Sequence, residues 1–139
     1  HQSYPLIKEF ARDNPSIKVI YQPYPVAGRP SVQDAKFVLA AGLQGKFHDA
    51  HEMILDKRMR GEEDLDIGAL AEELNVDALQ LIRDMKDTAV TEHLLGTLDA
   101  VKVLGINATP TWLIGDYVFK GVPDRDFLEE VVLEAYGPK

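Results

Sequence analysis

The chain has 139 residues, of which 45% are hydrophobic and 27% charged, so it is long enough for one domain with a buried core. Its formal net charge of -8 argues against a nucleic-acid-binding surface, and no apolar run reaches the roughly 20 residues that a membrane-spanning helix needs. The sequence contains no cysteine, which excludes disulfides, zinc–thiolate sites and thiol nucleophiles within these residues.

The chain opens with a helical pattern that is followed by an alternating one. Leu6, Ile7 and Phe10 stand at helical spacing, and Asn14-Pro15 ends that pattern because the residue before a proline disfavours helical backbone. Residues 16–24 alternate well enough between apolar and other side chains to predict a strand. The expected apolar face of this strand consists of Ile17, Val19 and Tyr21.

The middle of the sequence has helical patterns throughout. Prolines and glycines punctuate residues 23–30, and Ser31 is then placed to cap a helix whose residues 35–43 are almost all apolar. Asp77 and Asp87 are placed in the same way at the starts of later helices. The helices expected here cover residues 35–43, 46–59, 67–74, 77–85 and 88–104.

The last third of the chain predicts two strands and a helix. Gly115-Asp116 is a two-residue turn of the kind that joins hairpin strands, and β-branched and aromatic residues flank it. We expect strands over 111–114 and 117–119, and a helix over 124–135 that Asp124 starts. This element order, with several helices between the first strand and the hairpin, predicts an α/β fold with an inserted helical layer.

The segment between the long helix and the hairpin is the most distinctive local pattern. Gly105 is a helix C-terminal signal because glycine enters the left-handed backbone region without strain. Pro110 stands directly before the first hairpin strand, lacks an amide hydrogen, and can form a cis peptide bond with Thr109. This pattern predicts a bent loop whose neighbouring backbone groups are free to bind something; a plain turn with a trans proline is the alternative.

Two histidines lie three residues apart on the helix expected over 46–59. His48 and His51 would place two ligands on one face, with Glu52 adjacent, but neither a third ligand nor a His-Glu-x-x-His pattern is present. We therefore expect these histidines to make structural contacts, and we assign no metal site.

In chain order, these elements and residues resemble the DsbA-like thiol–disulfide oxidoreductases, which have a thioredoxin fold with a helical domain inserted in the middle. The resemblance covers essentially the whole chain, and the Thr-Pro loop is its most specific motif. The matching segments are Tyr4-Pro5-Leu6, Val19-Ile20-Tyr21, residues 25–31, residues 35–45 with Phe47, Gly105 to Thr111, and Gly121 with the closing helix. The resemblance implies a thioredoxin-like portion at 1–30 and 105–139, and an inserted helical domain at 31–104.

The sequence departs from this family at the catalytic motif. The family carries a Cys-X-X-Cys pair at the start of its first helix, where the helix dipole lowers the pKa of the first thiol. By the resemblance, His1 follows directly after the second cysteine and would tune the neighbouring thiolate as a cation or hydrogen-bond donor. We expect the Cys-X-X-Cys and the strand before it to lie upstream of His1. The fold would then be N-terminally incomplete, because residues 16–24 and 111–114 would lack the strand between them.

The resemblance also implies roles for the remaining site residues. Pro110 would be the cis proline that packs against the dithiol. Thr109 would expose backbone N–H and C=O groups to an extended substrate, and would tune the redox potential. The implied activity is disulfide exchange through a mixed disulfide, in the periplasm or another extracytoplasmic compartment. It would involve unfolded substrate proteins and a redox partner protein, but no cofactor, and no catalytic residue is expected within the chain itself.

Two other functions are open at this point. One is a redox-inactive thioredoxin-fold module that binds extended peptides through the Thr109-Pro110 loop. The other is a glutathione-dependent isomerase or transferase of the same superfamily. A Cys-X-X-Cys before His1 would separate the oxidoreductase from the redox-inactive module, and glutathione affinity would identify the third function.

Overall fold

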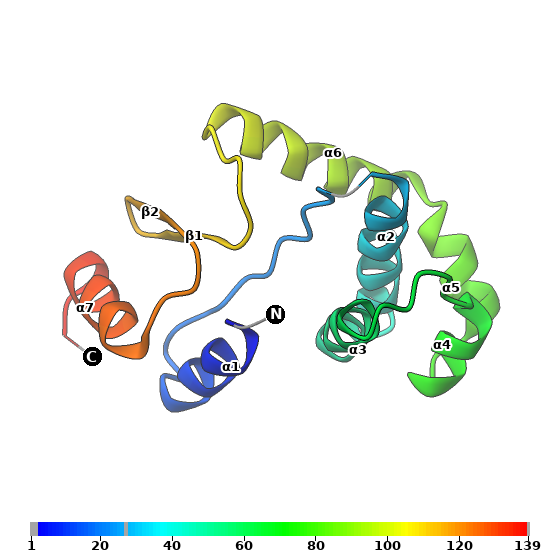
Figure 1. Ribbon diagram of the computed structural model, residues 1–139, viewed down its shortest axis with the longest axis horizontal. Coiled ribbons are helices and arrows are strands. Elements are labelled where there is room, and N and C mark those ends of the chain that lie inside the picture. The colour runs from blue at the N-terminus through cyan, green and yellow to red at the C-terminus, as the bar shows by residue number, and fades with distance from the viewer. Residues whose placement is uncertain (1–2, 27, 139) are drawn as a thin grey trace. The chain divides into compact units, whose positions relative to one another are not determined.

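A computed structural model describes residues 3–26 and 28–138, which form helices and one antiparallel pair of strands (Figure 1). The chain divides into two compact units, which we call the hairpin unit (1–21 with 104–139) and the helical unit (22–103). In chain order the elements are α1 (Tyr4–Asp13), α2 (Arg29–Leu43), α3 (Phe47–Met59), α4 (Ile67–Glu73), α5 (Ala78–Met85), α6 (Thr88–Val103), β1 (Thr111–Ile114), β2 (Tyr117–Lys120) and α7 (Arg125–Tyr136).

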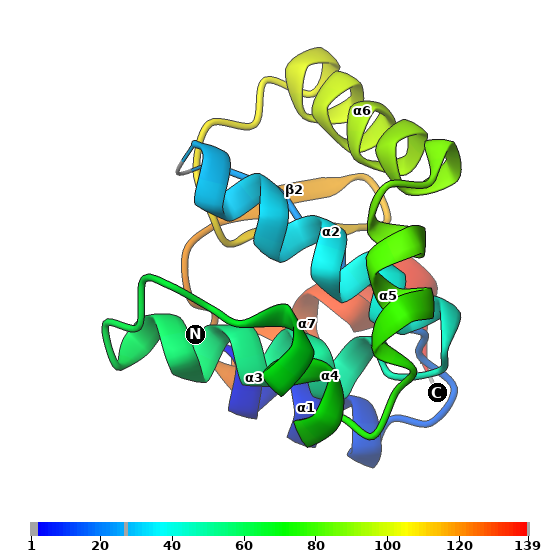
Figure 2. The same cartoon turned by 90° about the vertical axis from the view of Figure 1, so that its right-hand side faces the viewer.

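The helical unit is built around α2, which contacts α3, α5 and α6. Figure 2 shows α2 lying between α3 and α6. The apolar run at 35–43 explains this position, because a helix that is apolar on most sides is buried on most sides. The buried side chains of this core are Phe37, Val38, Ala40, Ala41, Ala50, Ile54, Leu70, Ala71, Leu74, Leu81 and Met85.

Aspartates start several of the helices, as the sequence predicts. The carboxylate of Asp77 accepts a hydrogen bond from Gln80 N, that of Asp87 from Ala89 N, and that of Asp124 from Phe127 N. Asp66 does the same for α4, accepting from Ala69 N.

The prediction that Ser31 caps a helix is wrong. α2 already begins at Arg29, with Gly28 in the N-cap position and no side-chain cap hydrogen bond. Pro30 explains the earlier start: its fixed φ suits the first helical turn, where its missing N–H group is not needed.

An arginine joins α2 to α3 in the helical unit. Arg58 makes a two-pronged ion pair with Asp34, at 2.7 Å and 2.8 Å, and donates two further hydrogen bonds to the carbonyl groups of Glu62 and Glu63. The planar guanidinium suits this arrangement because its donors lie in a fixed fork.

The hairpin unit packs two helices under one face of a short antiparallel hairpin. The strands pair from Thr111 opposite Lys120 to Ile114 opposite Tyr117, around the predicted Gly115-Asp116 turn. Figure 1 shows α1 and α7 on the same side of the hairpin. The core consists of Ile7, Phe10, Leu128 and Val132, with Leu6, Ile17, Val19, Tyr21, Trp112, Ile114 and Phe119 packed against it.

The prediction of a strand over residues 16–24 is wrong for the structure, although its apolar face is correct. Ile17, Val19 and Tyr21 pack on the core as expected, but this segment has no strand and no ladder partner among the described residues. A strand exists only when a neighbouring chain accepts and donates its backbone hydrogen bonds. The apolar alternation is therefore present here without the pairing that would make a strand.

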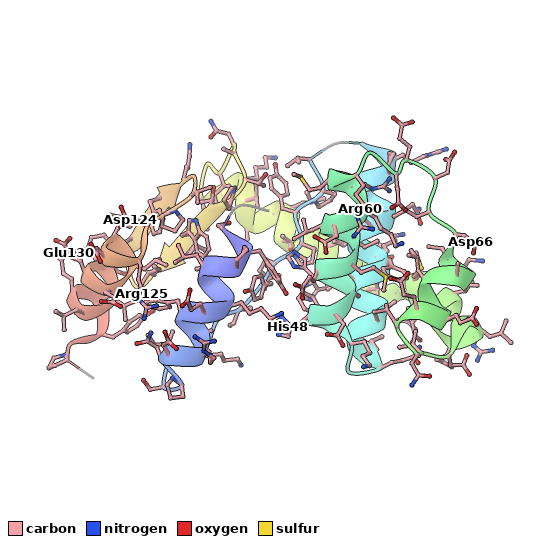
Figure 3. The ribbon with its side chains drawn as sticks, turned by 60° about the horizontal axis from the view of Figure 1, so that its bottom comes forward. His48, Arg60, Asp66, Asp124, Arg125 and Glu130 are labelled. Atoms are coloured by element: carbon pink, nitrogen blue, oxygen red, sulfur yellow. The ribbon has the colours of Figure 1, made fainter. Side chains whose placement is uncertain are left out.

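An ion-pair cluster ties α1 to α7. Arg125 donates a hydrogen bond to Asp13 at 2.9 Å and another to Glu129 at 2.9 Å. Figure 3 shows Arg125 at the start of α7, beside Asp124. None of the described helices is long and apolar enough to cross a membrane.

Candidate functional site

The loop between α6 and β1 has the bend that its sequence predicts. α6 ends at Val103, and Gly105 follows with a positive φ of 65°. The Thr109–Pro110 peptide bond is cis, which is the isomer that the family resemblance implies. Pro110 is half-buried, whereas Thr109 is exposed, so the loop presents Thr109 to solvent.

Hydrogen bonds hold the loop on both sides of Thr109. The Thr111 hydroxyl donates to the carbonyl of Ala108 at 2.6 Å, and Gly121 N donates to the carbonyl of Pro110 at 2.9 Å. The Trp112 indole N–H then donates to the carbonyl of Gly121 at 2.9 Å. The carbonyl groups before and after Thr109 are thus both occupied.

The backbone of Thr109 itself is left open. Its N–H and C=O groups make no hydrogen bond to any residue that the structure describes. An exposed donor and acceptor on one residue can pair with an extended peptide in the way that a sheet edge accepts a strand. The loop therefore holds one residue whose exposed backbone groups are open among the described residues.

Trp112 supports this loop from the core side. Its ring is half-buried and lies parallel to that of Phe119, with 6.0 Å between the ring centroids. It packs against the core of the hairpin unit while its indole nitrogen holds Gly121. The loop is consequently anchored to a packed ring.

A small apolar cavity of about 90 Å³ lies beside β1 in the hairpin unit. Residues of α1, β1 and α7 line it, together with Ile17 and Lys18. β1 pairs only with β2 among the described strands, and Lys18, Val19 and Ile20 make no backbone hydrogen bonds to described residues. Two segments with open backbone groups therefore border one apolar cavity.

A second unsatisfied group belongs to the same unit. Asn14 is 1% exposed, and its Nδ2 donates to the carbonyl of Phe10 at 2.8 Å. Its Oδ1 is buried and has no hydrogen-bond partner among the described residues. A buried acceptor without a donor destabilises a fold by about 1–3 kcal/mol. The hairpin unit therefore leaves both backbone and side-chain groups unsatisfied.

The structure brings Thr109 and Pro110 together at one exposed loop, whereas His1 lies outside the described residues. Gly121 and Trp112 also support this loop, which was not expected from the sequence. A signal for Gly121 was available, because a two-residue turn sets the hairpin register and Thr111 opposite Lys120 leaves Gly121 facing Pro110.

The paired histidines of α3 make ring contacts. His51 is half-buried and stacks on Phe47, with 6.1 Å between the ring centroids. Burial lowers the pKa of His51, and the nearby His48 lowers it further. Among the described residues there is no group of three or more side chains that could hold a metal ion.

Comparisons with known proteins were made on the sequence and on the fold. The model of the DSBA-like thioredoxin domain family matches residues 5–132. No curated protein matches the sequence.

Several solved structures are similar to the chain. A thioredoxin-like oxidoreductase from Silicibacter pomeroyi DSS-3 has 23% identity and a TM-score of 0.79, over 99% of this chain and 79% of that one. The thiol-disulfide exchange protein alpha-DsbA2 from Wolbachia pipientis has 26% identity and a TM-score of 0.78, over 92% and 70%. ScsC from Proteus mirabilis, in a compact conformation, has 25% identity and a TM-score of 0.71, over 94% and 72%.

Proposed function

The chain belongs to the DSBA-like thioredoxin domain family, and we propose that it supplies the substrate-binding part of a protein thiol–disulfide oxidoreductase. Its fold is a DsbA-like thioredoxin fold with an inserted helical domain. The observation that carries the proposal is the open backbone of Thr109, on a loop whose neighbouring carbonyl groups are occupied. In this proposal Thr109 pairs with the backbone of an extended substrate, and Pro110 lies against the reacting sulfur atoms.

The reacting sulfur atoms must come from outside these 139 residues, because the chain has no cysteine. We place the Cys-X-X-Cys upstream of His1, preceded by a strand. The two segments that border the apolar cavity support this placement, since an added strand would satisfy open backbone groups on both of its sides. His1 would then stand next to the second cysteine and influence its neighbour as a cation or donor.

The chemistry in this proposal is thiol–disulfide exchange. A substrate thiolate attacks one sulfur of the oxidised Cys-X-X-Cys, which forms a mixed disulfide and releases the other cysteine as a thiolate. A second substrate thiolate then attacks the substrate sulfur of the mixed disulfide. The substrate leaves with a new disulfide and the enzyme leaves as a dithiol, so two electrons pass from substrate to enzyme. A redox partner protein must reoxidise that dithiol. Such chemistry suits an extracytoplasmic compartment, where disulfides persist.

The mass and thiol content of the natural protein test this proposal. We expect an intact mass above the 15.5 kDa of these residues, and two alkylated thiols after reduction and denaturation. Every alkylated thiol would lie outside the 139 residues, because they contain no cysteine. Insulin reduction should then be blocked by prior alkylation. A mass of 15.5 kDa with no thiols would overturn the oxidoreductase proposal.

The absence of cysteine from the chain favours one second candidate, a redox-inactive module that binds extended peptides at Thr109. This candidate predicts peptide binding by a protein without thiols. Binding through the backbone should survive Thr109→Val, which keeps the N–H and C=O groups, and should weaken when the peptide backbone is N-methylated. The opposite result would mean that recognition runs through the Thr109 side chain.

A further inference from the structure

Two side chains meet beside the Thr109-Pro110 loop. The Lys120 ammonium donates a hydrogen bond to Asn107 Oδ1. Asn107 precedes Thr109 by two residues, and Lys120 stands opposite Thr111 in the hairpin, so the pair joins the residues that flank the open backbone of Thr109. Both side chains belong to exposed residues, and a ligand at Thr109 can reach them.

The contact between these two side chains leaves several donors available. An ammonium group has three donors, so Lys120 keeps two after it bonds Asn107. The amide oxygen of Asn107 is the atom that accepts, and its NH2 group makes no hydrogen bond to a described residue. Lys120 and Asn107 together thus offer several N–H donors and one positive charge to a neighbouring acceptor.

Lys120 is the basic residue of the hairpin and lies at its loop end. Within residues 104–122, the charged side chains are Lys120 and Asp116. Asp116 lies in the turn, and the strands run from Thr111 opposite Lys120 to Ile114 opposite Tyr117. Three residue steps along a strand amount to about 10 Å, which is about one Debye length at physiological salt. Although the whole chain is acidic, with a net charge of -8, this edge carries an exposed ammonium group that a neighbouring carboxylate can pair with.

We propose that Lys120 and Asn107 form a carboxylate subsite beside Thr109, which selects extended peptides with an aspartate or glutamate next to the segment that pairs with Thr109. The inference rests on the proposed peptide binding at Thr109 and names the substrate class for it. A carboxylate matches the subsite because it is acceptor-only, and charge-assisted hydrogen bonds are stronger than neutral ones. A basic side chain in the same position would be repelled by the ammonium group of Lys120.

Binding of matched peptides to the 139-residue chain tests the subsite. The probes are short, cysteine-free, extended peptides of one sequence with Glu, Gln or Lys at one position, and that position is moved along the peptide. At the best position we expect the Glu peptide to bind about two- to fivefold more tightly than the Gln peptide, as for an exposed ion pair. The Lys peptide should bind most weakly, and added salt should reduce the differences.

Two variants assign the preference to the subsite. Lys120→Gln should make the Glu and Gln peptides bind alike, and Asn107→Ala should reduce the preference without removing it. Lys86→Gln is the matched control, because it removes one charge from an exposed residue after α5 and should leave the preference unchanged.

Each result decides between distinct conclusions. Equal binding of the three peptides to the unchanged protein, or a Glu preference that survives Lys120→Gln, would overturn the subsite but leave peptide binding at Thr109 intact. A complete lack of binding by every peptide would overturn both the subsite and the peptide-binding loop. Neither result depends on the thiol content of the natural protein, which tests the oxidoreductase proposal separately.

Discussion

The helical unit and the hairpin unit both bury an apolar core, but they differ in where their backbone hydrogen bonds go. In the helical unit, each helix pairs most of its own N–H and C=O groups. Carboxylates at the helix N-termini, such as those of Asp66 and Asp77, accept hydrogen bonds from N–H groups of the first turn. The hairpin unit has a single ladder, between β1 and β2, among the described residues. Ile17, Val19 and Tyr21 pack on its core, but their segment joins no ladder among the described residues.

This difference is the physical basis for proposing that the hairpin unit binds a peptide. A helix closes its hydrogen bonds within one segment, whereas a strand needs a second segment beside it. The unit that depends on neighbours therefore keeps open groups, both at Thr109 and along the apolar cavity next to β1. In the helical unit, by contrast, the ion pair between Arg58 on α3 and Asp34 on α2 joins two helices that already pair their own backbone groups.

The largest expected difference is in amide hydrogen exchange. In the 139-residue chain, the amides of Lys18, Val19 and Ile20 should exchange at nearly the unprotected rate. Those of Phe37 and Val38, in the buried middle of α2, should exchange roughly a thousandfold more slowly, because they require the helical unit to open. Exchange followed by mass spectrometry or NMR measures both. Comparable protection of the two segments would contradict the conclusion that the backbone of residues 18–20 lacks hydrogen-bond partners in the described structure.

Phe37→Ala should strongly destabilise the helical unit. Phe37 is 1% exposed, and removal of a buried aromatic ring costs about 3–5 kcal/mol. Far-UV circular dichroism in urea reports mainly on the helices, while the fluorescence of Trp112, the single tryptophan, reports on the hairpin unit. We expect the dichroism transition to shift more than the fluorescence transition.

The matched control for this variant is Leu43→Ala. Leu43 is on the same helix but is 64% exposed, so the free energy of unfolding should change by about 0.5 kcal/mol or less. A similar loss for both variants would mean that burial does not decide the effect.

Gly115→Ala should destabilise the hairpin unit by about 2–4 kcal/mol. Gly115 has a positive φ of 56°, which an L side chain adopts at a cost of about 1–2 kcal/mol. An added Cβ would also lie 2.8 Å from the Cβ of Ala135 on α7, which adds overpacking.

Gly105→Ala separates the cost of a positive φ from the cost of the contact with Ala135. Gly105 has a φ of 65°, and nothing lies within 4 Å of an added Cβ. Trp112 fluorescence in urea should therefore show the smaller backbone effect alone, about 1–2 kcal/mol. If Gly115→Ala and Gly105→Ala destabilise the unit equally, then α7 moves away from the added methyl group at residue 115 without an energetic cost.

The smallest expected effect is the pH dependence of the contact between α1 and α7. Hydrogen bonds from Arg125, and then from Arg12, lower the pKa of Asp13 below its ordinary value of 3.8. The folded state therefore binds this proton less readily than the unfolded state. The resulting stability is present above about pH 3.8 and is lost as the pH falls through the lowered pKa.

Asp13→Asn tests this dependence. The difference in unfolding free energy between the unchanged protein and the variant should be constant from pH 7 to about pH 5, and should shrink below about pH 4. Because both partners are exposed, high salt should reduce the difference at every pH. A difference that grows on acidification would contradict the assigned ion pair.

Local chemistry was enough to predict most of the elements. Asp77 and Asp124 start helices through their own carboxylates, and Gly115-Asp116 turns the hairpin with the expected register. Pro30 shows the limit of this approach, because its fixed φ moved the start of α2 ahead of the expected Ser31 cap.

The candidate site was predicted in part. The bend at Gly105 and the exposed Thr109 follow from the sequence, but the hydrogen bonds that occupy the neighbouring carbonyl groups come from Thr111 and Gly121. The hydrogen bond from Gly121 N to the carbonyl of Pro110 joins the two sides of the hairpin, and local propensity does not predict it. The pairing of Asn107 with Lys120 likewise joins residues 13 positions apart.

By itself, then, the sequence determined what each segment can satisfy locally: the helices, their aspartate caps, the hairpin turn and the apolar face at Ile17, Val19 and Tyr21. The tertiary structure alone decided which backbone groups find partners at a distance. Among the described residues, it left 17–21 without a ladder and the N–H and C=O groups of Thr109 without a hydrogen bond. The physical reason is that pairing between strands is a contact between remote segments, whereas helical hydrogen bonds and caps join residues within one turn.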